Sequence, residues 1–154
     1  MGPGAIVLLV AGILLFVGLI QAAVWIPIVR KLRRLPERVR AELAASGEAV
    51  VRAPERGTYR GSSHPEFPRA AGTGVMALTE RRLVFRGIAG RPIDVPTARI
   101  RGVRQDTWFR SSARAGWVHV IVAVDGHGEV GFHARDPDAW AQALLRAAGL
   151  PVPS

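Results

Sequence analysis

The sequence contains no cysteine, and its first 29 residues contain no charged side chain. Without cysteine the chain can form no disulfide, offers no thiolate nucleophile and cannot hold a metal through cysteine. This composition suits a reducing compartment. Because every charged residue lies beyond position 29, the net charge of +9 belongs entirely to the rest of the chain. A basic balance of this size favours anionic partners, either lipid headgroups or nucleic acid.

Residues 5–29 form a nearly continuous apolar run in which Gln21 is the only strongly polar side chain. As a helix the run would be roughly 37 Å long, enough to cross a hydrocarbon core of about 30 Å. We therefore predict that residues 1–29 are a transmembrane helix with a short N-terminal tail. A cleaved signal peptide is the alternative, since Ala22 and Ala23 resemble a cleavage site. The run is long for a signal peptide, and no basic residue precedes it.

A cluster of basic residues follows the apolar run, and none precedes it. The positive-inside rule then places the N-terminus outside and the rest of the chain in the cytoplasm. We expect a single-pass protein of the cell (inner) membrane. The basic cluster is also the candidate site for lipid-headgroup contacts. We call it the collar, and it consists of Arg30, Lys31, Arg33 and Arg34.

Residues 30–46 predict a basic juxtamembrane helix or linker. Pro36 fits the first turn of a short helix, and Gly47 fits its C-terminal cap. Leu35, Val39 and Leu43 recur at four-residue spacing and form one apolar stripe. Because each basic residue near an anionic leaflet adds about 1 kcal/mol of attraction, the collar can hold this helix on the membrane surface. Two interpretations remain for the collar: it only sets topology, or it recognises lipid headgroups.

From residue 47 to residue 148 the pattern predicts a mainly β domain, and residues 149–154 are a tail. A glycine-rich turn at residues 125–128 joins two alternating strands, which is a hairpin signal. Asp136 is a candidate N-cap for a closing helix that Gly149 ends. Trp140 and Leu144 lie on one face of that helix, which should cover the sheet. The expected strands are residues 48–53, 58–61, 74–78, 82–86, 93–95, 100–103, 105–109, 117–124 and 129–134.

Residues 74–85, GVMALTERRLVF, resemble the hairpin of GRAM and bacterial pleckstrin-homology-like domains, in which a glycine-led strand is followed by Thr-x-x-Arg-Leu-x-Phe. The order of the flanking segments is similar too. The resemblance implies a bent antiparallel sheet or partial barrel capped by a C-terminal helix. It further implies a non-enzymatic module for lipid binding, protein binding or self-association. Phosphoinositide-binding members carry a basic cluster in the first hairpin loop. Arg52, Arg56 and Arg60 lie near that region here, without a Lys-x-Arg pattern.

The remaining polar residues do not predict catalysis. His119 and His133 lie on strands that should pair, so the two rings can meet, but no carboxylate accompanies them and we expect them to be partly solvated. Arg82 should begin a strand with its head in water. No phosphate-binding loop or nucleophile motif is present. We predict no cofactor, no metal and no small-molecule substrate. Four carboxylates near turns should be solvated, namely Asp94, Asp106, Asp125 and Glu129.

Aromatic and basic residues alternate between positions 108 and 117. Trp108, Phe109 and Trp117 surround Arg110 and Arg114, a pattern that can bind nucleic acid. A domain tethered beneath a bilayer is poorly placed for that role, and core packing accounts for the aromatics. We therefore expect no nucleic-acid partner.

These features predict a membrane-anchored, non-enzymatic interaction module on the cytoplasmic face. Its domain would dock a protein partner, or a second copy of itself, through an exposed sheet edge or loops. The alternative is a sensor of anionic lipid headgroups at the inner leaflet.

Overall fold

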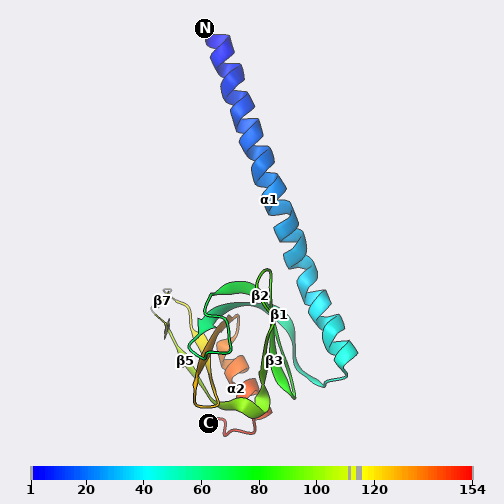
Figure 1. Cartoon of the computed structure of the whole chain (residues 1–154), viewed down its shortest axis with the longest axis vertical. Coiled ribbons are helices and arrows are strands. Elements are labelled where there is room, and N and C mark those ends of the chain that lie inside the picture. The colour runs from blue at the N-terminus through cyan, green and yellow to red at the C-terminus, as the bar shows by residue number, and fades with distance from the viewer. Residues whose placement is uncertain (1, 111, 114–115, 154) are drawn as a thin grey trace. The chain divides into compact units, whose positions relative to one another are not determined.

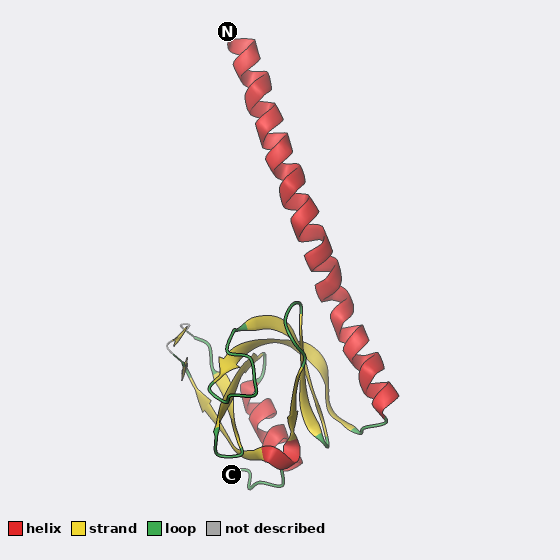
Figure 2. Cartoon of the chain, in the orientation of Figure 1, coloured by secondary structure: helices red, strands yellow, loops and turns green. Residues whose placement is uncertain are grey.

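The computed structural model describes residues 2–110, 112–113 and 116–153. The chain divides into two compact units, Met1–Arg34 and Leu35–Ser154. The first unit is helical. The second contains the end of the same helix, an antiparallel sheet and a C-terminal helix (Figures 1 and 2).

Helix α1 (Pro3–Ser46) is a single helix, where the sequence predicted two. Pro36, expected in the first turn of a separate helix, lies in its interior. An interior proline removes one hydrogen bond and costs about 3 kcal/mol. The neighbouring Leu35 and Val39 are buried in the second unit, and such packing outweighs local propensity. Gly47 follows the helix with a φ of 68°, as its predicted capping role requires.

The first part of α1 is long and apolar enough to cross a membrane. Every side chain from residue 7 to residue 29 is exposed, and the large hydrophobic ones range from 36% exposed at Ile28 to 76% at Leu8. A core helix of a soluble protein would be covered by other elements. No described part of this chain covers these side chains.

The second unit is built on a seven-stranded antiparallel sheet with the strand order β4-β3-β2-β1-β9-β8-β5. A separate two-stranded ribbon, β6-β7, interrupts the chain between β5 and β8. The bounds are β1 (Val50–Ser62), β2 (Gly72–Thr79), β3 (Arg82–Gly87), β4 (Ile93–Pro96), the short 3-10 helix η1 (Thr97–Arg99), β5 (Ile100–Asp106), β6 (Trp108–Phe109), β7 (Ser112–Ala113), β8 (His119–Val124), β9 (Gly128–Ala134) and α2 (Pro137–Ala147).

The sheet is open and is not a closed barrel, so the barrel part of the expectation is not supported. Its edges are β4 and β5, and no register joins them among the described residues. β4 has only four residues and ends at Pro96, which lacks the N–H that a ladder needs. The turn η1 then leads directly into β5 at the opposite edge. The antiparallel sheet with a C-terminal helix is as predicted.

β1 is one strand of thirteen residues, whereas the sequence predicted two strands, residues 48–53 and 58–61, with the first ended by Pro54. Pro54 falls where the pairing with β2 shifts register, between Arg52 and Glu55. Because an irregular pair leaves one residue out of the ladder, a proline is tolerated there. The proline suggested the end of a strand, and the sequence alone could not show that the strand continues past it.

The hairpin of β8 and β9 confirms the glycine-turn prediction. Asp125 and Gly126 have φ values of 52° and 72°, and the His127 N–H donates to the Val124 carbonyl over 3.1 Å. Positive φ at both central residues characterises the type I′ turn that suits a twisted hairpin.

Helix α2 covers the inner face of the sheet, as predicted. Trp140 and Leu144 are fully buried in the main core with Phe132 and other strand residues. The Asp136 side chain accepts a hydrogen bond from the Ala139 N–H, and Gly149 with a φ of 68° follows the C-terminus. The predicted caps are therefore confirmed.

The last turns of α1 cover the outer face of the sheet at β2 and β3. Leu35, Val39 and Leu43 form a second core cluster with side chains that point outward from the two strands. Arg86 of β3 makes an ion pair with Glu42 of the helix, and the hydrogen bond from Arg86 lowers the pKa of Glu42 below its usual value. The apolar stripe that the sequence predicted packs on the sheet. The strand residues it covers are Val75, Ala77 and Val84.

Replacing Leu43 with alanine should weaken the second unit. The Leu43 side chain is almost completely buried, so its truncation should lower the free energy of unfolding by about 2–5 kcal/mol. Denaturant unfolding of the detergent-solubilised chain, followed by tryptophan fluorescence, measures this. Leu15→Ala makes the same chemical change at an exposed position of α1 and should leave the transition unchanged. Equal transitions for both variants would contradict the packing.

Candidate functional site

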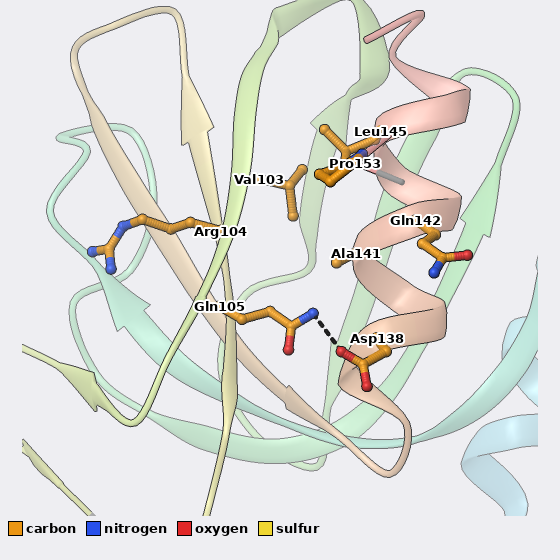
Figure 3. A pocket seen from close by; sticks show the side chains of 8 residues that line it. All are labelled: Val103, Arg104, Gln105, Asp138, Ala141, Gln142, Leu145 and Pro153. Atoms are coloured by element: carbon orange, nitrogen blue, oxygen red, sulfur yellow. Dashed lines mark hydrogen bonds between the residues drawn. The ribbon is translucent and has the colours of Figure 1, made fainter. Parts of the chain in front are cut away.

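A groove of about 340 Å³ lies between β5 and α2. Its walls come from an edge strand, one face of the C-terminal helix and the chain after that helix (Figure 3). The apolar side chains that line it are Val103, Ala141, Leu145 and Pro153, and the polar ones are Arg104, Gln105, Asp138 and Gln142.

An irregularity in β5 sets which side chains enter the groove. The pairing with β8 shifts register between Ile100 and Gly102. Ile100 is buried in the main core, and Val103 packs against that core from the groove side. Figure 3 shows Gln105 reaching toward α2, where its Nε2 donates to Asp138 Oδ1 over 2.9 Å, while Arg104 points away. Because of this register shift, the side chains of Val103 and Gln105 both face α2.

The backbone of β5 supplies hydrogen-bonding groups along the same groove. Within the part of the chain that the structure describes, β5 pairs with β8 on one side and with no strand on the other. In an antiparallel ladder alternate residues direct their N–H and C=O groups to opposite sides. β5 therefore offers a seven-residue template for an added strand, whereas the other edge, β4, is short and ends in proline.

The groove edge carries positive charge. Arg101 is exposed, and its guanidinium donates only to the Ala98 carbonyl among the described residues, over 3.2 Å. Arg104 pairs with Asp106 at 2.8 Å and with Glu129 at 2.9 Å. The hydrogen bond to Glu129 raises the pKa of Arg104 above its ordinary value. The N–H of Trp108 is the main reason that the pKa of Asp106 is lowered.

Beyond β5 the chain presents one exposed aromatic ring. Trp108 is 56% exposed, so core packing does not account for it, contrary to the expectation. Phe109 is buried as expected, and it lies so close to Gly131 that a Cβ there would meet the ring at 2.5 Å. Arg110 donates to the Ser62 and Arg69 carbonyls. Arg114 lies outside the described residues.

The collar residues are all exposed on α1. Among the described residues none of the four forms an ion pair. Their contact with lipid headgroups remains a prediction. The arginines noted near the first strand do not converge: Arg52 lies over the Trp140 ring at 4.8 Å, while Arg56 lines a depression on the outer face of the sheet.

The carboxylates expected to be solvated remain partly exposed, and each is also paired with an arginine. Asp94 binds both Arg82 and Arg86, at 3.2 and 3.1 Å. Asp125 pairs with Arg99, and Asp106 and Glu129 share Arg104. The expectation that Arg82 extends into water is wrong, because its side chain is 25% exposed and bridges Glu48 and Asp94. The ion pairs of Arg82 and Arg86 with Asp94 join β3 to β4, and sequence spacing alone could not reveal them.

The paired histidines meet as the strand order suggested. The His119 and His133 rings lie 6.1 Å apart in an edge-on arrangement. His133 Nδ1 lies 3.0 Å from the Val118 carbonyl, and its ring stacks on Trp117 at 3.9 Å. His119 is fully buried, contrary to the expectation of partial solvation. In the described part of the chain, no group of three potential metal-ligating side chains surrounds them.

His119 should make the fold sensitive to acid. Neither of its ring nitrogens has a hydrogen-bond partner among the described residues, and burial lowers its pKa, with Arg60 and His133 adding to the effect and Asp106 opposing it. The folded state therefore resists protonation that the unfolded state accepts below its pKa of about 6.5. Stability should fall as the pH drops below that value, by up to about 1.4 kcal/mol per pH unit until the folded-state pKa is reached.

Thermal unfolding between pH 7.5 and pH 5 tests this prediction. His119→Leu should flatten the pH dependence of the midpoint, whereas His127→Leu, at an exposed turn, should leave it unchanged. A wild-type midpoint that stays constant across the range would contradict a buried neutral histidine.

Comparison with known proteins gives the fold and no function. No protein-family model and no curated protein matches the chain. Among solved structures, the C-terminal domain of an unknown protein from Leishmania infantum is similar, with a TM-score of 0.51 and 12% sequence identity. The match covers 73% of this chain and 95% of that chain. At this identity the likeness is one of fold alone.

Proposed function

We propose that the chain is a membrane-anchored, non-enzymatic interaction module with a pleckstrin-homology-like domain. The seven-stranded antiparallel sheet with a C-terminal helix is compatible with this resemblance, and residues 74–85 form the hairpin of β2 and β3. The apolar part of α1 anchors the domain in the cell (inner) membrane. The collar follows that span, so the positive-inside rule supports a cytoplasmic domain.

The observation that carries the proposed function is the open edge of β5 beside the apolar groove. An extended peptide can add to such an edge as a further strand, because its backbone satisfies the outward N–H and C=O groups. Its alternate side chains would then enter the groove over Val103 and Leu145. Trp108 is exposed just beyond the strand, and tryptophan is among the residues that most often contribute strongly to interfaces.

The occupant is an extended, acidic segment of a partner protein. Arg101 is exposed and forms no ion pair among the described residues, so it gives the strand a positive charge that complements an acidic side chain. A second copy fits less well. Two β5 strands paired antiparallel about residues 102 and 103 would place Arg101 of each copy opposite Arg104 of the other, so neither Arg101 would gain an acidic partner. Anchoring raises the effective concentration of the domain toward partners in the same membrane.

Site-specific photocrosslinking in cells tests the docking site. A photoreactive residue at Gln142, on the groove rim, should crosslink to a protein through an acidic segment. The same residue at Arg81, which is 75% exposed on the β2–β3 turn, should not. Arg101→Glu should reduce the Gln142 crosslink several-fold because it repels the acidic segment.

Three outcomes would contradict the proposal. They are equal crosslinking from both positions, a crosslink insensitive to Arg101→Glu, and a crosslink between two copies of the chain. The last would identify self-association in place of a partner.

A second candidate function is the sensing of anionic lipid headgroups by the collar. It is supported by the exposure of all four collar side chains. If it holds, the purified chain should retain anionic phospholipid in native mass spectrometry. Changing Arg30, Lys31, Arg33 and Arg34 to glutamine should remove that lipid, while Arg38→Gln with Arg40→Gln should not. A collar that only sets topology predicts no selective retention in the wild type.

A further inference from the structure

The outer face of the sheet is covered on two sides. Residues 35–46 of α1 pack over β2 and β3. On the other side, Phe109 packs on Gly131 of β9 and Trp117 stacks on His133. The middle strand β1 stays accessible between these covers, and Arg56 is exposed there.

A depression of about 320 Å³ lies on this uncovered strip. Thr58 of β1 is the register partner of Thr73 on β2 and of His133 on β9, so the three residues form one row across three strands. Two hydroxyl groups and an imidazole therefore stand side by side. All three residues line the depression.

Two arginines stand next to this row. The β1–β9 ladder ends at the pair of Gly57 and Ala134, and Arg56 and Arg135 are the residues next to this pair in the sequence. Both side chains are exposed and line the depression. Like charges in neighbouring cross-strand positions repel each other, so this arrangement costs stability unless an anion lies between them.

No carboxylate of the described residues neutralises this pair. The acidic neighbours in sequence are engaged elsewhere: Glu55 accepts hydrogen bonds from Trp140 and Arg52, and Asp136 caps α2. Four other arginines of the domain, Arg82, Arg86, Arg99 and Arg104, each reach at least one carboxylate. Arg56 and Arg135 form no ion pair among the described residues, and they line the same depression.

We propose that this depression binds a phosphate-bearing anion. Arg56 and Arg135 supply guanidinium groups, which bind phosphate oxygens through paired hydrogen bonds. Thr58 and Thr73 supply hydroxyl donors, and His133 supplies the ring nitrogen that does not face the Val118 carbonyl. The phosphate belongs either to a soluble phosphorylated compound or to a phospholipid headgroup. The site is separate from the β5 groove and from the collar, so it does not depend on the proposed docking function.

Histidine side-chain NMR of the full chain in nanodiscs tests the site, with His133→Gln to assign the signal. In phosphatidylcholine nanodiscs, inorganic phosphate should shift the His133 signal saturably at constant ionic strength. Arg56→Gln and Arg135→Gln should each weaken that response at least about tenfold. Arg101→Gln, which removes an exposed arginine of β5, should not.

A second arm distinguishes the two sources of phosphate. If nanodiscs containing phosphatidic acid shift the same signal, and the shift requires Arg56 and Arg135, the ligand is a headgroup. A response to inorganic phosphate alone points to a soluble compound. The inference is overturned if neither probe shifts His133, or if Arg56→Gln and Arg135→Gln respond like Arg101→Gln. Unchanged unfolding midpoints confirm that each variant is folded.

Discussion

The first part of this molecule consists mainly of apolar side chains, and no other described element covers them. From residue 7 to residue 29 every side chain of α1 is exposed, and nearly all are apolar. Burying such surface contributes about 25 cal/mol per Å², so this stretch is stable only in an apolar environment. A bilayer provides it, and a helix satisfies its own backbone hydrogen bonds there. The proposed tethering of the domain and the proposed partners both depend on this constraint.

The same helix becomes part of the domain a few residues later. At Leu35 its environment changes to the outer face of β2 and β3, and Val39 and Leu43 continue the contact. These two strands are consequently buried on both faces, with α2 and the main core on the inner side. Helix α1 runs through the boundary between the two compact units, which lies between Arg34 and Leu35.

The two candidate binding sites use what this packing leaves uncovered. At one edge of the sheet β5 keeps unpaired backbone groups beside an apolar groove, which suits an extended peptide. On the outer face β1 keeps a strip with two unneutralised arginines, which suits a phosphate group. The proposed strand addition and the proposed anion binding depend on different residues, so neither would exclude the other.

Local sequence signals predicted the parts of the fold that depend on neighbouring residues. The β8–β9 hairpin followed from Asp125 and Gly126, and α2 followed from Asp136, Pro137 and Gly149. Long-range pairing could not be predicted in this way. Pro54 suggested the end of a strand, but β1 continues through it because the pairing with β2 shifts register there. Nothing in the sequence showed that β4 and β5 do not pair.

An exposed sheet edge was expected, but the residues that form the candidate sites could not be predicted, for the same reason. Arg56 and Arg135 are 79 residues apart in the sequence and line the same depression only because β1 pairs with β9. The stripe of Leu35, Val39 and Leu43 was recognised, but the sequence could not distinguish a membrane surface from a sheet as its partner. Burial of His119 likewise depends on residues that are distant in the chain.

Protease accessibility in intact cells tests the central claim most directly. With a tag at the C-terminus, the account predicts a full-length protein in the membrane fraction whose domain is resistant to protease added outside. The domain should become sensitive once the membrane is opened. A shortened soluble product, as from a cleaved signal peptide, or a domain digested in intact cells would contradict it.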